Sequence, residues 1–409
     1  MMQLRPILST LRRHKTAALL IVLEIALTCA IVCNSVFLIA NRIERVRFGS
    51  GLAESELVYI GTRMIGRDAN LAALTREDLA ALRAIPGVRA AGVMSQIPYG
   101  DESWNTGISL KPGQAKSTID VANYAANAGL PGLLGLKLVA GRDFNADEVV
   151  PMSDVRTASN LKLPSALVTR AVADRLFPGD DAVGKTIYLF GDNPTRIVGV
   201  LDRLVRPQPA QAGQDDLYSI VMPVMPDFEE GTYMLRVDPA QRDAVLKAAE
   251  AALDRHDVPR VLQAKGRYDE LRAGYYQSDV AMVWLLVGVC VALLVVTAFG
   301  IVGLASFWVQ QRTKMIGTRR ALGATRGQIL RYFQVENLLL TSAGIAVGMV
   351  AAFGINQWLM TQYELPRLPL LYLPLGAVAL WALGQVAVLS PARRAAALPP
   401  ALAMRGLAD

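Results

Sequence analysis

Four long apolar segments dominate this sequence and limit what it can fold into. They cover residues 17–40, 281–309, 335–360 and 371–389. A helix needs about 20 mainly apolar residues to cross the hydrocarbon core of a bilayer, and the four segments meet that length. Only 19% of all residues are charged, whereas soluble domains carry about a quarter. The sequence therefore predicts a membrane protein with four transmembrane helices.

A cleaved signal peptide is the alternative for the first apolar segment. The apolar part of a signal peptide is about 7–15 residues long and leads into small residues at a cleavage site. Residues 17–40 form a longer run, and Leu27-Thr28-Cys29 is a poor match to a lipoprotein cleavage box. We therefore interpret this segment as the first transmembrane helix.

The distribution of charge predicts the orientation. Three segments (residues 1–16, 310–334 and 390–409) hold 13 Lys and Arg residues but one acidic residue, Asp409. In the rest of the chain acidic residues outnumber basic ones. Short cytoplasmic segments of membrane proteins are rich in Lys and Arg. We expect both termini and the loop 310–334 to be cytoplasmic, with residues 41–280 and the short loop 361–370 on the other side of the membrane.

The long segment 41–280 has the pattern of a folded domain. Two β-α-β units stand near its ends, which predicts a split ferredoxin-like unit around a mixed α+β insertion at about 115–225. Thr75 is the expected N-cap of the first helix. We expect residues 41–50 and 267–280 to extend the first two transmembrane helices as a helical stalk. The strands and helices expected in the two units are 57–60, 76–84 and 88–95, then 232–237, 241–255 and 259–265.

The predicted fold class is thus an α-helical membrane protein with four transmembrane helices. A large α+β periplasmic domain, made of the split ferredoxin-like βαβ unit and an inserted mixed α+β subdomain, lies between helices 1 and 2.

Residues 179–186 match the phosphate-loop pattern of nucleotide-binding proteins. A functional phosphate loop follows a strand and opens a helix, whose N-terminal amides bind the phosphates. Here an amphipathic stretch, 168–177, precedes the loop and a strand-like stretch, 186–190, follows it. Asp180 and Asp181 would also repel phosphate. We interpret the segment as a turn; the alternative, an ATP-using membrane enzyme, rests on Lys185 alone.

The predicted cytoplasmic loop contains Gly317-Thr318-Arg319-Arg320-Ala321-Leu322-Gly323-Ala324, and the chain closes with Pro391-Ala392-Arg393-Arg394-Ala395-Ala396. With residues 136–144 and 175–185 of the outer domain, these motifs closely resemble the MacB/FtsX-type ABC transporter permeases, type VII-like and with a MacB-like periplasmic core. The resemblance covers the whole chain. Met315 departs from it, because an acidic residue is usual at that position, and pairing with an ATPase could differ accordingly.

The resemblance implies that this loop couples the permease to its ATPase. A short helix broken by Gly317 and Gly323 would lie along the membrane surface, with arginines for acidic partner residues and apolar residues for a groove. Charge alone would equally allow an anchor for anionic lipids. The expected coupling residues are Arg312, Lys314, Ile316, Gly317, Arg319, Arg320, Leu322, Gly323, Ala324 and Thr325.

Polar and small residues within the spans are further candidates. Glu24 and Glu336 lie near the cytoplasmic boundary, close to Lys15 and Arg331 respectively. Ionisable groups in membranes are costly, so we favour ion-pair or packing roles for them over proton or substrate handling. Gly344 and Gly348 form a Gly-x-x-x-Gly step for close helix contact, either within the subunit or between subunits.

Nothing in the sequence predicts catalysis. The three cysteines lie in apolar segments and the two histidines are far apart, so we expect no disulfide framework and no metal site. Paired carboxylates such as Asp180/Asp181 lack a partnered base. We expect no catalytic residue, no cofactor bound by this chain and no nucleic-acid partner.

The resemblance implies a permease subunit that works by mechanotransmission. ATP and Mg would be used by a separate ABC ATPase subunit, and a second permease subunit, identical or paralogous, would complete the assembly. A periplasmic adaptor and an outer-membrane channel are further implied partners. The implied cargo is a peptide, lipopeptide, antibiotic or lipoprotein taken from the periplasm. The alternative is an FtsX-like transmitter that regulates a periplasmic partner such as a cell-wall hydrolase.

Overall fold

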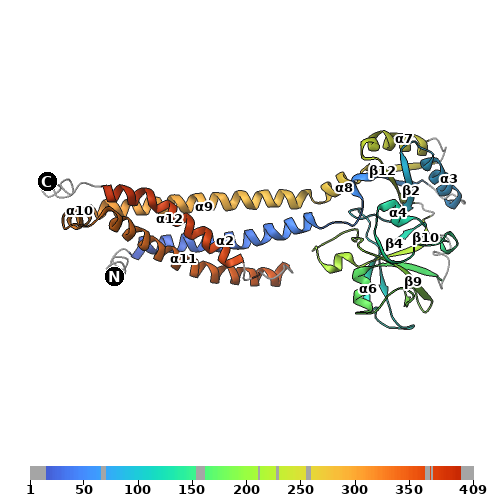
Figure 1. Cartoon of the computed structure of the whole chain (residues 1–409), viewed down its shortest axis with the longest axis horizontal. Coiled ribbons are helices and arrows are strands. Elements are labelled where there is room, and N and C mark those ends of the chain that lie inside the picture. Colours follow the sequence, from blue (N-terminus) through green and yellow to red (C-terminus); the bar gives the residue numbers. More distant parts are fainter. Residues whose placement is uncertain are drawn as a thin grey trace. The chain divides into compact units, whose positions relative to one another are not determined.

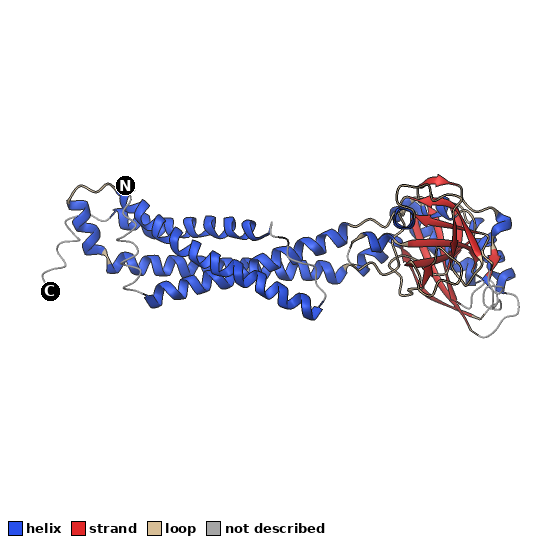
Figure 2. Ribbon diagram, turned by 90° about the horizontal axis from the view of Figure 1, so that it is seen from below, coloured by secondary structure: helices blue, strands red, loops and turns tan. Residues whose placement is uncertain are grey.

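The computed structural model describes residues 15–65, 71–152, 162–210, 212–226, 230–254, 259–363, 369 and 372–397. The chain divides into two compact units. We call Met1–Ile43 together with Asp279–Asp409 the bundle, and Glu44–Ser278 the head. Figures 1 and 2 show that long helices make up the bundle, whereas strands occur in the head.

Four helices are long and apolar enough to cross a membrane, which confirms the four predicted spans. Each helix runs beyond the apolar segment that predicted it, because its polar ends are helical as well. A short helix, α10, lies between α9 and α11, and residues 364–368 and 398–409 fall outside the described part of the chain. The helices are α2 (Lys15–Arg47), α9 (Gln277–Gln311), α10 (Thr313–Ala321), α11 (Arg326–Tyr363) and α12 (Tyr372–Ala397).

Glycines on α11 let it approach α2 closely. A Cβ atom at position 344 would lie 2.7 Å from the Cβ of Ile25, and one at position 348 would lie 2.6 Å from the Cβ of Cys29. Any side chain at these two positions would force the helices apart. Gly344 and Gly348 therefore serve a contact within the subunit.

The two β-α-β units of the head form one four-stranded antiparallel region, in the order β12-β1-β11-β2. Val58 and Ile60 point to the face covered by Leu79 and Leu82 of α3 and by Val245 of α7. This arrangement confirms the split ferredoxin-like unit. Its elements are β1 (Leu57–Met64), α3 (Leu71–Arg83), β2 (Val88–Met94), β11 (Glu230–Val237), α7 (Arg242–Asp254) and β12 (Arg260–Arg267).

The remaining strands continue the same sheet instead of forming a separate one. β2 meets β4 at a single residue pair, Met94 with Ala126, and the order continues as β4-β10-β7-β9-β5. The inserted part begins earlier than expected, since β3 pairs with β4. Its elements are β3 (Asn105–Ile108), β4 (Ile119–Ala126), α4 (Leu130–Leu134), β5 (Leu138–Gly141), β6 (Val150–Pro151), β7 (Ser165–Thr169), α6 (Arg170–Leu176), β8 (Thr186–Tyr188), β9 (Pro194–Leu201) and β10 (Ser219–Met225).

The connecting elements around the sheet are short. Helix α8 (Tyr268–Tyr275) follows β12 and leads into α9, so the helical stretch expected over 267–280 begins one residue later and is interrupted at Tyr276. At the start of the head's chain, α2 ends at Arg47, three residues before the end of the helical stretch expected over 41–50. Four 3-10 turns complete the described head: Glu54–Glu56, Ala146–Glu148, Gln214–Leu217 and Pro239–Gln241.

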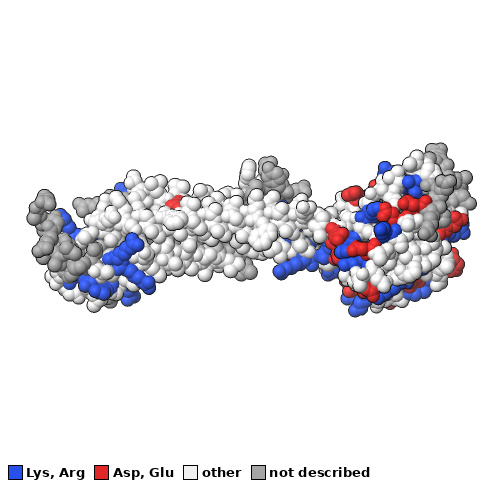
Figure 3. Space-filling model, turned by 90° about the horizontal axis from the view of Figure 1, so that it is seen from above, with Lys and Arg blue, Asp and Glu red and all other residues white. Residues whose placement is uncertain are grey.

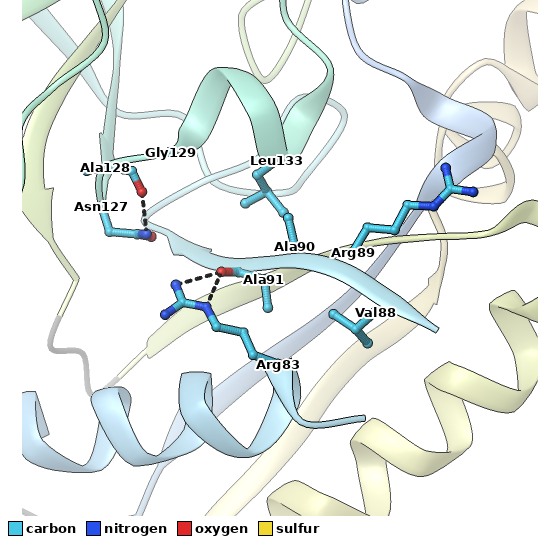
Figure 4. Close-up of a pocket in the computed structure, with 9 residues that line it drawn as sticks. All are labelled: Arg83, Val88, Arg89, Ala90, Ala91, Asn127, Ala128, Gly129 and Leu133. Atoms are coloured by element: carbon cyan, nitrogen blue, oxygen red, sulfur yellow. Dashed lines mark hydrogen bonds between the residues drawn. The ribbon is translucent and has the colours of Figure 1, made fainter. Parts of the chain in front are cut away.

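Figure 4 shows a cleft of about 350 Å³ along the edge of β2 that β4 leaves open. Arg83 of α3 donates two hydrogen bonds to the carbonyl oxygen of Ala91, at 3.2 and 2.9 Å. The side-chain oxygen of Asn127 accepts one from the backbone N–H of Val93, at 3.3 Å. Side chains thus satisfy backbone groups of an open strand edge, which protects it from pairing with another chain.

Two local predictions had different outcomes. Thr75 is not an N-cap: it lies inside α3, and its hydroxyl donates to the carbonyl oxygen of Leu71 at 3.0 Å. The phosphate-loop pattern is a turn, as predicted, because it connects helix α6 to strand β8. Gly179 and Gly184 have positive φ angles there, which favour glycine, and Lys185 lies 3.4 Å from Asp180.

A buried ion pair holds the helical layer of the head to its sheet. Arg260 of β12 donates to the carboxylate of Asp78 on α3, with one distance of 2.9 Å, and the hydroxyl of Tyr233 donates to the same carboxylate at 2.7 Å. The side chains of Arg260 and Asp78 are 4% and 0% exposed. Burial raises the pKa of Tyr233, and the nearby Asp78 carboxylate raises it further, so the phenol remains a hydrogen-bond donor.

We expect Asp78→Ala to destabilise the head strongly, because the buried guanidinium of Arg260 would lose its counter-charge. Removing one partner of a buried pair costs about 3–5 kcal/mol. Thermal unfolding of the purified chain, followed by circular dichroism, measures the effect. The control is Asp243→Ala, which breaks the exposed pair with Arg267 and should change the midpoint little. Equal shifts in the two variants would contradict the prediction.

Candidate coupling site at the α9–α10–α11 junction

The loop between α9 and α11 is a structured helix and turn. Helix α10 ends in a Schellman motif, in which Gly323 N–H donates to Arg320 O at 3.2 Å and Ala324 N–H donates to Arg319 O at 3.0 Å. Gly323 has φ +92°, a conformation that favours glycine. Gly317 was expected to break the helix as well, but it lies buried inside α10. Only the second of the two glycines ends the helix.

The next helix starts at a capping box. The side-chain oxygen of Thr325 accepts from the N–H of Gln328 at 3.3 Å, and the side-chain oxygen of Gln328 accepts from the N–H of Thr325 at 2.9 Å. Gly323 and Thr325, both predicted as coupling residues, therefore shape the turn that separates α10 from α11.

A buried ion pair fixes the start of α10 to α11. Nη1 of Arg312 lies 2.7 and 3.0 Å from the two carboxylate oxygens of Glu336. The two side chains are 8% and 1% exposed, and the guanidinium also lies over the ring of Trp308, 5.1 Å from its centroid. Arg312 is thus an internal anchor and is not on the surface where we expected it.

The neighbour that we expected for Glu336 does not reach it. Arg331 lies five residues earlier on the same helix, and five residues turn an α-helix by roughly 140° beyond a full turn, so the two side chains point in different directions. The partner comes from the α9–α10 junction, 24 residues away in sequence.

Some of the other predicted coupling residues are held by contacts within the bundle, and the others are exposed. Ile316 is 2% exposed and packs into the apolar core of the bundle. Arg320 donates to the carbonyl oxygen of Ala396 on α12, and the guanidinium of Arg319 lies over the ring of Tyr332 at 5.1 Å. Lys314 is exposed, and Leu322, on the turn after α10, is 83% exposed.

An exposed leucine beside bound arginines is the main surface feature of this site. In Figure 3, Lys and Arg gather at one end of the bundle, whereas its long middle part shows little charge. Leu322 is the most exposed of the large apolar side chains in the described part of the chain, at 83%.

A row of contacts joins α2 to α9 within the bundle. The carboxylate of Glu24 packs against Gly300, where a Cβ atom would lie 2.5 Å from a carboxylate oxygen. The hydroxyls of Thr28 and Thr297 are hydrogen-bonded at 2.8 Å. Further along, Arg42 and Asp279 form an ion pair. Residue numbers rise on α2 as they fall on α9, so the helices are antiparallel and joined at three levels.

Glu24 itself makes no ion pair within the described residues, and so Lys15 is not its partner there. Space for its carboxylate comes from the missing side chain of Gly300. Our sequence reasoning missed Arg42 and Asp279, although a signal was present. Arg42 lies two positions after the first predicted span, and Asp279 lies two positions before the second. Their charges are opposite.

Arg272 connects the segment that enters the head to the segment that leaves it. The guanidinium of Arg272, on α8, donates to the carbonyl oxygens of Val46 and Phe48 at 2.8 and 3.0 Å. It also forms an ion pair of 3.0 Å with Glu54 and lies over the ring of Tyr276. The segment that enters the head and the segment that leaves it are therefore held by the same side chain.

The described residues contain no cluster of three or more His, Cys, Asp or Glu side chains that could hold a metal ion. Cys29, Cys33 and Cys290 are buried and free. Four membrane-length helices, an α/β domain inserted after the first of them, and an anchored basic helix between the second and third define a class of polytopic membrane proteins with an extramembrane domain.

Two family models match the chain. The MacB-like periplasmic core domain matches residues 19–253, and the C-terminal part of the FtsX-like permeases matches residues 287–400. The chain belongs to the family of MacB- and FtsX-like ABC transporter permeases, which confirms the resemblance seen in the sequence.

Relatives with these domains are transport components. The chain is 25% identical over 340 residues to the uncharacterized ABC transporter permease YknZ of Bacillus subtilis, covering 81% of this chain and 79% of the relative. It is also 25% identical over 352 residues to the macrolide export ATP-binding/permease protein MacB of Acinetobacter baylyi, covering 83% of this chain. The match spans only 49% of that MacB.

Solved structures of extramembrane domains are also similar to the chain. The extracellular domain of YknZ matches with a TM-score of 0.32 and 15% identity, over 50% of this chain and 100% of that domain. The periplasmic region of MacB from Actinobacillus actinomycetemcomitans matches with a TM-score of 0.33 and 13% identity, over 55% of this chain and 94% of that region.

We expect Glu336→Gln to lower the thermal midpoint of the bundle, because a buried guanidinium would be left without its counter-charge. The double variant Arg312→Met/Glu336→Met should recover most of the loss, since both buried charges are then removed. Unfolding of the purified chain in detergent measures both effects. The matched control is Glu24→Gln, which removes from the same bundle a carboxylate that has no ion pair among the described residues, and which should not destabilise the bundle. If Glu24→Gln lowered the thermal midpoint as much as Glu336→Gln does, the structural role of the Arg312–Glu336 ion pair would be contradicted.

Proposed function

We propose that this chain is the permease subunit of an ABC transporter and works by mechanotransmission. ATP hydrolysis by a separate ATPase subunit, which binds the ATP and Mg, would displace α10, and the displacement would change the conformation of the head. The observation that carries this proposal is the combination of a highly exposed Leu322 with a helix rooted in the bundle by Arg312 and Glu336. A partner that binds to α10 can displace this helix without unfolding it.

The anchoring contacts supply a path for the displacement within the bundle. Arg312 ties α10 to α11, and Arg320 ties it to α12. Helix α9, which leads directly into α10, is joined to α2 by the Thr28–Thr297 hydrogen bond and the Arg42–Asp279 ion pair. Movement of α10 is thereby shared by helices that are continuous with both ends of the head's chain.

The location follows from the charge pattern. The basic end of the bundle would face the cytoplasm, with both termini, and the head would lie in the periplasm, so that the chain spans the inner membrane of a bacterium. Most buried side chains of the described bundle are apolar, which favours mechanical coupling over passage of a polar cargo between the helices.

Partners and cargo follow from the family. A second permease subunit, identical or paralogous, would bind a second ATPase, and a periplasmic adaptor and an outer-membrane channel would complete an exporter. The cargo would be a peptide, lipopeptide, antibiotic or lipoprotein, in line with the macrolide export named for the MacB relatives. Capture of a cell-wall hydrolase, without any cargo-dependent phenotype, would instead favour the FtsX-like transmitter.

We expect Leu322→Asp, and deletion of residues 319–325, to lower stimulated ATP turnover by at least about 10-fold, because the apolar contact with the ATPase would be lost. The measurement is ATP hydrolysis by the co-purified complex in lipid nanodiscs. Thr318→Ala is the control, since the hydroxyl of Thr318 is exposed and bonds only to the carbonyl oxygen of Lys314, at 3.0 Å. Unchanged turnover in Leu322→Asp, with normal membrane insertion, would refute the coupling role.

We expect Arg42→Asp to uncouple transport from ATP turnover, because like charges would then face each other between α2 and α9. ATP turnover should persist, whereas transport should be lost, so that the cells show the same phenotype as cells in which the gene is deleted. The charge swap Arg42→Asp/Asp279→Arg should restore function. Glu44→Arg, a change of the exposed carboxylate two positions further along α2, is the control. Failure of the swap to rescue would show that the ion pair does not transmit the movement.

A further inference from the structure

One face of the ferredoxin-like region contains a cleft of about 440 Å³. Its floor is formed by β1, β11 and β12, and the chain from Ser95 to Glu102, after β2, forms a wall. Helices α3 and α7 pack against the opposite face through Val58 and Ile60. Ligand sites in proteins typically measure about 300–1,000 Å³, and the volume of this cleft lies in that range. We call it the sheet cleft.

Small residues on neighbouring strands make the sheet cleft hollow. Gly61 of β1 pairs with Thr232 of β11, and Ala264 of β12 lies on its other side. A Cβ atom at position 61 would lie 3.3 Å from the carbonyl oxygen of Ala264, so a larger residue there would require the backbone of β12 to shift by a few tenths of an ångström. Alternate residues of a strand share a face, which places Tyr59 and Arg63 on either side of Gly61.

The sheet cleft carries an excess of negative charge. It is lined by the carboxylates of Asp101, Glu102 and Glu230 but by one cation, Arg63. Arg63 donates to both carboxylate oxygens of Glu230, at 2.6 and 2.7 Å. Glu102 accepts a hydrogen bond from the neutral indole of Trp104, and Asp101 has no side-chain partner among the described residues. Asp101 and Glu102 form no ion pair within 4.0 Å among the described residues, so the lining holds three carboxylates and one guanidinium.

The hydroxyl of Tyr59, in the lining, has no hydrogen-bond partner within the described residues either. The side chain of Tyr59 is nine-tenths buried. Burial raises the pKa of Tyr59, and the carboxylates of Asp101 and Glu270 raise it further, so the group stays protonated and can donate or accept. The hydroxyl oxygen keeps some solvent access and lies in the lining of the sheet cleft, so a ligand bound there can hydrogen-bond to it.

Aromatic and apolar groups surround these polar atoms. Ile97 and Leu271 line the sheet cleft, and the indole of Trp104, which is 58% exposed, is bonded to Glu102 on its wall. Faces of aromatic rings attract ammonium and guanidinium groups. The lining therefore offers apolar contact to a ligand and negative charge to its polar groups.

We propose that the sheet cleft binds a cationic amphiphilic peptide. Its basic side chains pair with Asp101 and Glu102, an apolar side chain lies over the floor at Gly61, and the hydroxyl of Tyr59 hydrogen-bonds to its backbone. That such a peptide is the cargo rests on the proposed function, whereas the binding itself does not.

The test is a binding measurement on the purified full-length chain in neutral detergent, without ATPase. The probe is a fluorescein-labelled Lys-Leu-Lys-Leu-Lys peptide, followed by fluorescence anisotropy. We expect saturable binding that weakens with added NaCl, and at least about 10-fold weaker binding to Asp101→Asn/Glu102→Gln. Tyr59→Phe should also weaken binding. The acidic counterpart Glu-Leu-Glu-Leu-Glu should not bind.

A matched control separates a local site from general attraction to an acidic surface. Glu77 on α3 and Asp174 on α6 are exposed, outside the lining of the sheet cleft, and without an ion pair among the described residues. Glu77→Gln/Asp174→Asn changes the net charge by the same amount and should leave binding unchanged. Equal weakening in both double variants, unaltered binding to Asp101→Asn/Glu102→Gln, or absence of saturable binding would overturn the proposal. Because no ATPase is present, such a result would leave the coupling role of Leu322 untouched.

Discussion

The buried ion pair between Arg312 and Glu336 is the interaction on which the rest of the proposed mechanism depends. A fully buried charge is costly without a counter-charge at close range, so the pair fixes where α10 starts and against which helix. The Schellman motif at Gly323 and the capping box at Thr325 then fix where α10 ends and α11 begins. Leu322, on the turn between the two helices, is 83% exposed.

The same principle recurs at other depths. Thr28 with Thr297 and Arg42 with Asp279 join α2 to α9 through polar groups that are costly to separate in an apolar setting. In the head, Arg272 holds the entering and leaving segments together. Apolar packing between helices can slide, whereas a hydrogen bond has one register. These contacts make the helix pair a connection of defined length.

The two faces of the ferredoxin-like sheet differ, because α3 and α7 cover one face and the sheet cleft lies on the other. Apolar residues on alternate positions of β1 bring α3 and α7 onto one side, and the buried Asp78–Arg260 pair holds that layer in place. On the other side, glycine and other small residues leave the sheet cleft, and acidic residues surround it. Residues of α4 and α8 pack against other parts of this second face, so the sheet cleft is a local opening on it.

The sequence by itself determined the four membrane helices, the two β-α-β units, the turn at 179–186 and the family, because length, apolar composition and short-range periodicity are local properties. Only the tertiary structure decided that Glu336 pairs with Arg312 and not with Arg331, that Gly317 lies inside a helix, and that Gly344 faces α2. It also divided the coupling residues into buried anchors and an exposed Leu322. The rotation and depth of each helix select these partners, and both depend on how residues far apart in sequence pack together.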